Sequence, residues 1–310
     1  MCAAQRVLVV GEALVDVVHR PNGEVDEHPG GSPLNVAIGL ARLGHVVEFA
    51  TRFGADDHGE LVREHVAREP LVTLTPGSAE ADRTSVAEAF LDQHGAAKYN
   101  FDMVWDVGQA LDGPTVGHLH TGSIAATLDP GASDVLALAR RTRRTGTVSY
   151  DPNARPTVMG SPAAVRGRIE ELVGLSDVVK ASDEDLAWLY PGEPVDQALG
   201  RWGSAGALLI VLTKGGQGVT ALLCSTGERV DLPATKTQVV DTIGAGDSFM
   251  AGLVSGLLDA GLLGSIQARE HFRTANLAHV LPALQRAIAC ATITVSRAGA
   301  NPVTRTELYS

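Results

Sequence analysis

The sequence predicts an α/β fold: a doubly wound, mainly parallel sheet with helices on both faces, and a second, small β-sheet beside it. From residue 116 onward, short apolar runs alternate with helix-like stretches, which is typical of a parallel sheet. Earlier runs alternate apolar and polar residues, as half-exposed strands do. Finally, residues 241–249 lead through glycines from an apolar run into an apolar helix, an arrangement that creates an anion site.

Length and composition restrict the function classes. The 310 residues contain no linker or low-complexity tract, so we expect a single domain over residues 1–310. A formal net charge of −11 without a basic stripe argues against nucleic-acid binding. The three cysteines, Cys2, Cys224 and Cys290, are odd in number and lack metal-ligand spacing, which favours a reducing cytoplasm. We see no secretory or membrane-spanning segment, and therefore expect neither a membrane protein nor a periplasmic binding protein.

The N-terminal third contains one central strand and several half-exposed ones. Residues 6–11 are rich in β-branched side chains and predict a central parallel strand. Residues 35–43 have helical periodicity and are followed by a glycine. Three alternating segments predict the strands of the small sheet, at about 13–20, 46–52 and 84–102.

The remaining elements alternate in type along the chain. The predicted strands are residues 116–119, 147–150, 178–179, 208–212 and 219–223. The predicted helices between them are residues 130–142, 161–175 and 183–189. Residues 271–282 are less regular and indicate an inserted surface loop or helix before a last helix over 284–296. Ligands of such sheets bind at the carboxyl ends of the strands.

The loop at residues 241–249 (DTIGAGDSF) carries the strongest chemical signal. Gly244 and Gly246 let the backbone approach an anion closely, since neither has a Cβ. Asp247 lies at the entrance of this anion site, where a carboxylate would repel phosphate unless it has a chemical task. One such task is to take a proton from a hydroxyl that attacks the phosphate. The alternative, a helix N-cap, fits these residues equally well.

This loop resembles the C-terminal signature of the ribokinase/PfkB family of carbohydrate kinases, in Asp241, Thr242, Gly244, Ala245, Gly246, Asp247 and Phe249. The resemblance implies that Asp247 is the catalytic base. It also implies that the backbone of Gly244, Ala245 and Gly246 holds the transferred phosphoryl group. The expected fold is then ribokinase-like, a Rossmann-like domain in which the small sheet forms a lid over a sugar.

Residues 30–44 (GGSPLNVAIGLARLG) resemble the N-terminal signature of the same family. Without the resemblance, a glycine-rich turn with Asn35 as a cap explains this run better. With it, the expected sugar-binding residues are Asp16, Gly30, Gly31, Asn35, Arg155 and Asp247. A carboxylate and an amide suit neighbouring sugar hydroxyls. Tyr99 and Phe101 would come from a lid strand to cover the sugar.

Two further elements match the family, each with a simpler alternative. Residues 151–155 (DPNAR) resemble its Asp-Pro-Asn-x-Arg element, and residues 213–218 (TKGGQG) its nucleotide-contacting turn. A proline-fixed loop and a glycine-rich hairpin explain the same residues structurally. The resemblance implies nucleotide contacts at Asn153, Lys180, Thr213, Lys214, Gly215, Gly218 and Gly246.

Residues 180–185 lie where many relatives carry Asn-x-x-Glu, tied to magnesium; here Ser182 and Asp185 stand at those positions. This implies a magnesium role for Asp185, while Ser182 as a helix cap explains the segment equally well. In some relatives the C-terminal turn binds a monovalent cation such as K⁺. The residues expected there are Asp241, Ile243, Ala298 and Ala300.

We therefore expect an ATP-dependent sugar kinase that uses Mg²⁺ and is most similar to bacterial fructokinases, with a homodimer formed through the lid. Ribokinase, 2-keto-3-deoxygluconate kinase and nucleoside kinase activities stay open, and a non-catalytic sugar- or nucleotide-binding regulator is the alternative from another class. The chain has no Walker A loop, no zinc motif and no Gly-x-Gly-x-x-Gly after its first strand. These absences disfavour P-loop kinases, zinc enzymes and dinucleotide oxidoreductases.

Overall fold

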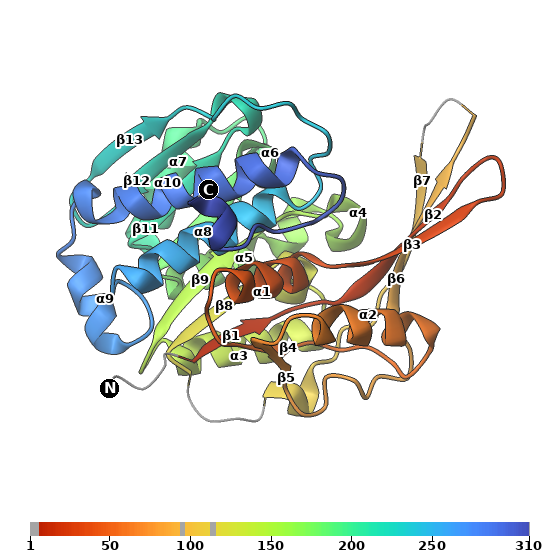
Figure 1. The fold of residues 1–310 in the computed structure, drawn as a ribbon. Coiled ribbons are helices and arrows are strands. Elements are labelled where there is room, and N and C mark those ends of the chain that lie inside the picture. Colours follow the sequence, from red (N-terminus) through yellow and green to blue (C-terminus); the bar gives the residue numbers. More distant parts are fainter. Residues whose placement is uncertain (1–5, 94–96, 112–115, 310) are drawn as a thin grey trace.

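The computed structural model describes residues 6–93, 97–111 and 116–309, and its centre is a nine-stranded sheet (Figure 1). The strand order is β13-β12-β11-β10-β9-β8-β1-β4-β5. Neighbouring strands from β5 to β11 are parallel, while β12 and β13 add an antiparallel edge. The strands are β1 (Val7–Val10), β4 (Val47–Ala50), β5 (Val72–Leu74), β8 (His118–Gly122), β9 (Thr147–Asp151), β10 (Val178–Ser182), β11 (Leu209–Thr213), β12 (Val219–Leu223) and β13 (Glu228–Leu232).

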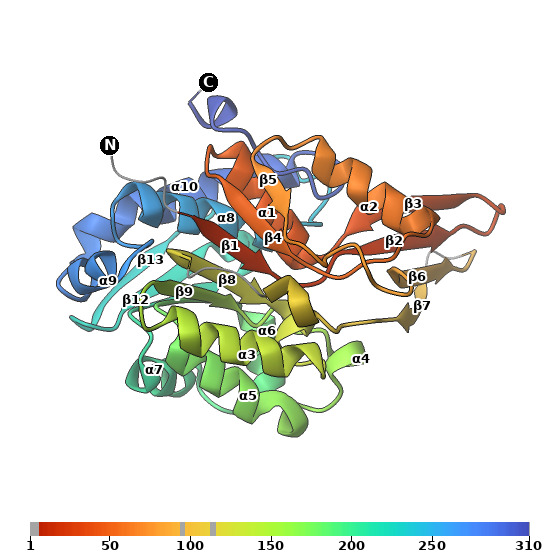
Figure 2. The same cartoon turned by 90° about the horizontal axis from the view of Figure 1, so that it is seen from below.

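Helices cover both faces of this sheet, so the doubly wound arrangement is confirmed (Figure 2). One apolar cluster joins the sheet to α1 (Ser32–Arg42), α2 (Asp57–Ala67), α8 (Ala245–Asp259), α9 (Ile266–Arg273) and α10 (Leu277–Val295). A second cluster joins the opposite face to α3 (Gly131–Thr142), α5 (Pro162–Leu175), α6 (Asp183–Leu189) and α7 (Val195–Ala205). A short helix, α4 (Pro156–Met159), follows β9.

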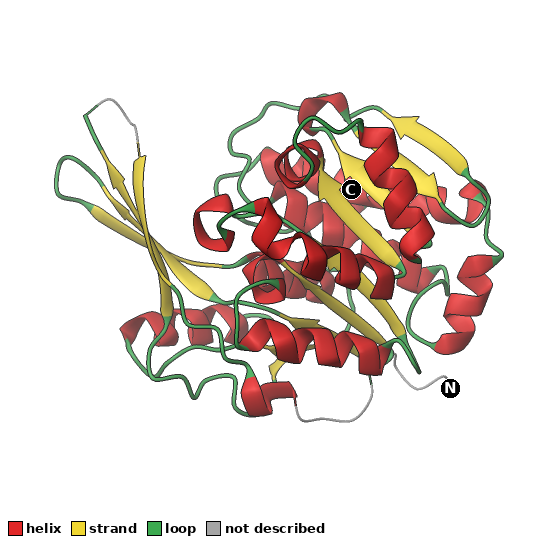
Figure 3. Cartoon of the chain, turned by 180° about the vertical axis from the view of Figure 1, so that it is seen from behind, coloured by secondary structure: helices red, strands yellow, loops and turns green. Residues whose placement is uncertain are grey.

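A separate four-stranded sheet projects from this body, as Figures 1 and 3 show. Its order is β3-β2-β6-β7, and β2 pairs antiparallel with β3 and parallel with β6. Its strands are β2 (Leu14–His19), β3 (Val25–Gly30), β6 (Ser85–Leu91) and β7 (Ala97–Asp102). Of the segments predicted for the small sheet, 13–20 and 84–102 belong to it, although residues 94–96 lie outside the described part.

The assignment of residues 46–52 to the small sheet is wrong. These residues form β4, which pairs in parallel with β1 inside the large sheet. The apolar side chains Val47 and Phe49 point to the same face of the strand and are fully buried in the apolar cluster that joins the sheet to α1 and α2. The remaining strand of the small sheet is β3, whose sequence VDEHPG is polar, contains proline, and therefore gives no strand pattern.

The last helix also differs from its prediction. It begins at Leu277 instead of residue 284 and runs through Pro282, which sequence reasoning treats as a helix boundary. Among the described residues, α10 is the one helix long and apolar enough to cross a membrane. In this fold it packs against α8, where a Cβ on Gly256 would lie 2.5 Å from Cα of Ala283. Core packing accounts for the face that contains Val280, Ala283, Leu284 and Ala287, which are buried.

Candidate active site

A cavity of about 930 Å³ lies between the small sheet, the carboxyl ends of the parallel strands and the N-terminus of α8. Asp16 and Phe101 of the small sheet line one end. Thr213 and Gly218, around β11, line the other, and α8 begins between them. This placement follows from parallel topology, which brings the loops after β1, β8, β9, β10 and β11 to the same edge.

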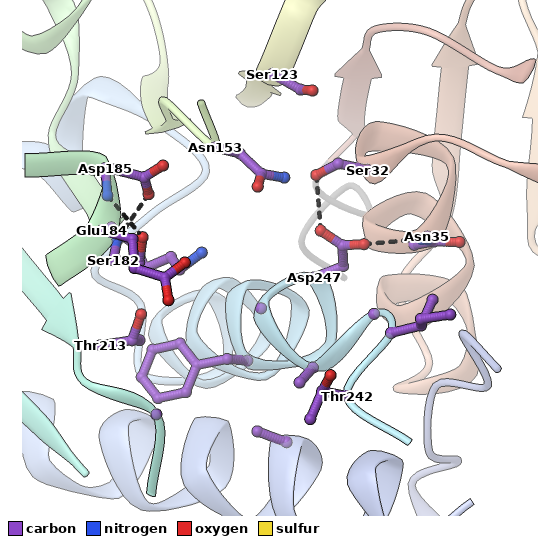
Figure 4. A pocket seen from close by; sticks show the side chains of 18 of the residues that line it. Ser32, Asn35, Ser123, Asn153, Ser182, Glu184, Asp185, Thr213, Thr242 and Asp247 are labelled. Atoms are coloured by element: carbon purple, nitrogen blue, oxygen red, sulfur yellow. Dashed lines mark hydrogen bonds between the residues drawn. The ribbon is translucent and has the colours of Figure 1, made fainter. Parts of the chain in front are cut away.

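Asp247 lies in the first turn of α8, and its carboxylate is held from two sides (Figure 4). Its Oδ1 accepts a hydrogen bond from the Ser32 hydroxyl at 2.7 Å, and its Oδ2 accepts one from the Asn35 amide at 2.8 Å. The N-cap of α8 is Gly244, without a side-chain cap. The N-cap explanation of Asp247 is therefore wrong, and the carboxylate is a buried group that faces the cavity.

The glycines of the loop have separate steric reasons. Gly244 has φ of 73°, in the left-handed region that favours glycine, and a Cβ there would lie 2.8 Å from that of Ala300. A Cβ on Gly246 would lie 3.1 Å from Nζ of Lys180. The first N–H groups of a helix have no partner within it, and the helix dipole adds positive potential at this end. The loop can therefore receive a phosphoryl group.

A buried ion pair lies below this loop. Nζ of Lys180 is 2.6 Å from Oδ2 of Asp151, and both side chains are almost inaccessible to solvent. Burial raises the pKa of Asp151 to about 6, with Lys180 acting in the opposite direction. Burial opposes the charge on Lys180, but Asp151, Asp185 and Asp247 outweigh it and raise the pKa of the lysine. An ammonium thus stands beside the anion loop.

The helix-cap explanation of residues 182–185 is confirmed. The Asp185 N–H donates to Oγ of Ser182 at 3.0 Å, and the Ser182 N–H donates to Oδ2 of Asp185 at 2.7 Å. Oδ1 of Asp185 accepts from the Ala154 N–H at 2.7 Å. Asp185 nevertheless lines the cavity beside Glu184 (Figure 4), so its magnesium role stays a prediction. No group of three His, Cys, Asp or Glu side chains that could hold a metal occurs in the described ranges.

At the end predicted to bind the nucleotide, Thr213, Gly215 and Gly218 line the cavity as expected. Lys214 does not belong to the lining, because its ammonium lies 3.3 Å from Asp231 on β13. A different lysine, Lys236, lines this end. It lies in an irregular segment without a motif, so sequence reasoning had no signal for it.

At the end predicted to bind the sugar, the cavity is lined by Asp16, Gly31, Asn35, Arg155 and Phe101, and Asn153, predicted to contact the nucleotide, lines it beside Arg155. Gly30 packs instead against the Asp16 side chain, since a Cβ there would lie 2.2 Å from Oδ2. Tyr99 stays outside the lining and is 59% exposed. The Arg155 guanidinium donates to Oδ1 of Asn153 at 2.8 Å. Surrounding protein raises the pKa of Asp16 by desolvation, which Arg155 and His28 partly offset.

The residues expected around a monovalent cation belong to two segments that lie side by side. Oδ1 of Asp241 accepts from the Ile243 N–H at 3.0 Å, and Oδ2 accepts from the Gly299 N–H at 2.8 Å. The bond from the Ile243 N–H and, to a smaller extent, the bond from the Gly299 N–H hold the pKa of Asp241 below its usual value. They bring residues 241–243 against the turn that contains Ala298 and Ala300, directly behind the anion loop.

Besides Lys236, the prediction did not include Ser32, Asp151, Glu12 and Ser123. Ser32 holds Asp247, Asp151 pairs with Lys180, and Glu12 and Ser123 form part of the cavity wall. Ser32 lies inside the glycine-rich run that was singled out, so its position could have identified it. Glu12 lies two residues after the end of β1 and Ser123 directly follows β8, which is where a parallel sheet places ligand-binding residues.

Comparison with known proteins agrees with this geometry. Residues 4–307 match the model of the pfkB family carbohydrate kinases. A fructokinase from Klebsiella pneumoniae is 32% identical over 304 residues, which cover 95% of this chain and 94% of that protein.

Solved structures extend the comparison. Fructokinase from Xylella fastidiosa with bound ATP superposes with a TM-score of 0.85 at 24% identity, over 99% of this chain and 98% of that one. Fructokinase from Vibrio cholerae O395, in a form with fructose, ADP and calcium bound, gives 0.80 at 27% identity, over 99% and 98%. A potassium-bound form of a double mutant of the same enzyme, also with fructose and ADP, gives 0.79 at 25% identity and the same coverage. The chain belongs to the pfkB family of carbohydrate kinases.

Proposed function

We propose that this chain transfers the γ-phosphoryl group of ATP to a primary hydroxyl of fructose. The observation that carries the proposal is the position of Asp247, held by Ser32 and Asn35 between the two ends of one cavity. The identity of about a third with a named fructokinase over nearly the whole chain supports the choice of sugar.

In this mechanism Asp247 takes the proton from the attacking hydroxyl, because its carboxylate faces the cavity and the residue directly follows the anion loop. The hydrogen bonds from Ser32 and Asn35 keep both oxygens oriented toward the sugar end. The N–H groups of Gly244 and Gly246 donate to the phosphoryl oxygens, whereas the Ala245 N–H donates to the Thr242 carbonyl at 3.3 Å. One well-aimed donor of this kind contributes on the order of 3 kcal/mol to the transition state. The Lys180 ammonium adds positive charge below the same loop.

The donor atoms present fit the expected cations. Asp185 lines the cavity, and each of its carboxylate oxygens accepts one N–H and keeps a further lone pair, which suits the oxygen preference of Mg²⁺. Bound there with the nucleotide, Mg²⁺ would neutralise phosphate charge. Backbone carbonyls around Ile243, Ala298 and Ala300 are the hard donors that K⁺ prefers, and Asp241 ties their two segments together.

The small sheet acts as a lid and as a dimer contact in this proposal. It reaches the sugar end of the cavity through Asp16 and Phe101. Beyond that contact it exposes Tyr99 and Phe90, which are 59% and 43% accessible. The two rings lie on opposite faces of the sheet, because Tyr99 pairs with Ala89 and Phe90 with Lys98, and a second copy packed on the Tyr99 face would bury that ring. Sedimentation analysis of the wild type and of Tyr99→Ser checks the dimer, and a wild-type monomer at enzymatic working concentration contradicts it.

We place the enzyme in the cytoplasm. Cys2 lies outside the described residues, whereas Cys224 and Cys290 carry free thiols, as a reducing compartment allows.

The decisive experiment is coupled ADP release from ATP and magnesium with fructose, ribose, 2-keto-3-deoxygluconate, adenosine and fructose 6-phosphate. We expect turnover on fructose and a loss of several orders of magnitude in Asp247→Asn. Asp57→Asn is the matched control, since Asp57 is an exposed acid in the first turn of α2. Turnover on another acceptor keeps the mechanism and replaces the sugar. Full activity of Asp247→Asn contradicts the mechanism, and ligand binding without any turnover indicates a regulator.

A further inference from the structure

Glu12 is a buried carboxyl group in the wall of the cavity that the mechanism above does not use. It follows β1 and is 4% exposed. Its Oε2 atom has no hydrogen-bond partner within the described ranges. A buried polar atom without a partner is costly, and native proteins keep such atoms mainly where function needs them.

Ser123 is the neighbour that connects Glu12 to the ligand space. It opens the 3₁₀ turn η2 (Ser123–Ala126) after β8, with φ of 55°, a left-handed conformation that serine rarely adopts. The β1–β8 register pairs Val10 with Thr121, so Ser123 lies next to Glu12 two positions farther along, and the Ser123 hydroxyl is among the influences that lower the pKa of the Glu12 carboxyl. Figure 4 shows Ser123 at the same cavity as Asn153 and Ser32.

We propose that the Ser123 hydroxyl contacts the sugar and that Glu12 positions this hydroxyl, with the neutral carboxylic acid as the form that binds sugar. This inference rests on the proposed function. A protonated Glu12 can donate its proton to Ser123, whose own O–H then remains free for a sugar oxygen. An ionised Glu12 accepts the Ser123 proton, so that Ser123 offers the sugar only lone pairs.

The electrostatics of the cavity favour the neutral form. Burial raises the pKa of Glu12 to about 7, against the opposing effects of its hydrogen bonds and of Arg155. The other acids that line this end are Asp16 and Asp247. A bound sugar removes water from the wall and raises the cost of an ionised Glu12 further. Sugar binding is therefore coupled to proton retention by Glu12.

The test is the pH profile of the KM for the sugar that the wild type turns over best. We expect this KM to rise several-fold as pH increases through about 7 in the wild type. In Glu12→Gln, which imitates the neutral acid, the rise should disappear. The KM for ATP serves as the internal reference. Asp16 also titrates at this end, so the difference between the two profiles isolates Glu12.

A second variant tests the contact itself. Ser123→Ala should raise the KM for the sugar about tenfold, which is the loss of affinity expected from removing one hydrogen bond. The KM for ATP should stay unchanged. Ser204→Ala on α7 is the control, because that exposed serine bonds only within its own helix. An unchanged sugar KM in Ser123→Ala, or an intact pH inflection in Glu12→Gln, overturns this inference alone. A wild type without turnover on any sugar overturns the proposed function and this inference together.

Discussion

The side-chain amide of Asn35 donates a hydrogen bond of 2.8 Å to Oδ2 of Asp247, a residue 212 positions farther along the chain. This bond joins the start of α1 to the start of α8, two helices whose N-termini meet at the cavity. Ser32 provides a second bond from α1 to the same carboxylate. The two sequence signatures of the family are therefore one structural unit around Asp247.

Removing this support should lower turnover without unfolding the protein. We expect Asn35→Ala to reduce kcat by about 10- to 100-fold, since a misoriented base loses most of its advantage. The sugar KM should rise as well, because Asn35 lines the sugar end. Asn22→Ala, at an exposed turn, is the matched control. Equal kcat in both variants would show that Asp247 needs no support from Asn35.

The two glycines of the anion loop should respond differently to alanine. Gly244→Ala must place a side chain at φ of 73° and against Ala300, so it should destabilise the fold by about 1–2 kcal/mol. Gly246 lies within α8, where alanine is favourable, but its Cβ would approach Lys180 at the phosphate floor. Gly246→Ala should therefore keep its stability and lose activity. Urea unfolding and kcat/KM for ATP separate the two outcomes.

The ion pair between Lys180 and Asp151 should behave as a buried pair. Lys180→Met leaves Asp151 without its partner, and Asp151→Asn leaves Lys180 without its own; each should cost about 3–5 kcal/mol of unfolding free energy. The double variant removes both charges and should be more stable than either single variant. Urea unfolding of the four proteins measures the coupling energy. Additive losses would mean that the two groups do not interact.

Glu12 should make the protein less stable as pH rises. Its pKa is about 7 in the fold against an ordinary value of 4.5, so between these values the native state binds more protons than the unfolded state. The free energy of unfolding then falls with pH, by a total on the order of 3 kcal/mol. The contribution is intact below pH 4.5 and lost above about 7.

Glu12→Gln removes this titration, so its unfolding free energy should fall less over the same interval. Asp151 also has a raised pKa and contributes to the slope in both proteins. The difference between wild type and variant is therefore the quantity to read. Parallel stability profiles in urea would show that Glu12 is not protonated near neutral pH.

The sequence predicted those features that are determined by residues close together in the chain, and it did not predict those that depend on contacts between distant segments. The loop at residues 241–249 has its turn chemistry and helix start in one short segment, and its position at the cavity followed directly. Residues 46–52 alternate like an exposed strand, but their parallel pairing with β1 and β5 decides their sheet, and no local pattern contains that fact. Lys214 stands in the expected turn, yet its side chain pairs with Asp231 across the hairpin.

The same reasoning applies to polar networks. The partners of Asp247 and Lys180 lie far away in sequence, so the sequence alone does not predict that these side chains are in contact. Pro282 was expected to end a helix, but it lies inside α10. Packing of α10 on α8 stabilises the helix by more than the loss of one backbone hydrogen bond at the proline destabilises it.

That packing gives the last prediction. On α8, Gly256 lies so close to α10 that a Cβ would be 2.6 Å from Cβ of Ala283 and 2.5 Å from its Cα. Gly256→Ala should separate the two helices and cost about 1–3 kcal/mol. Gly167 on α5 is exposed and helical with nothing near its Cβ position, so Gly167→Ala should stabilise by about 0.5–1 kcal/mol. Thermal unfolding of both variants checks the opposite signs. A stabilising Gly256→Ala would mean that α8 and α10 are less tightly packed than the structure shows.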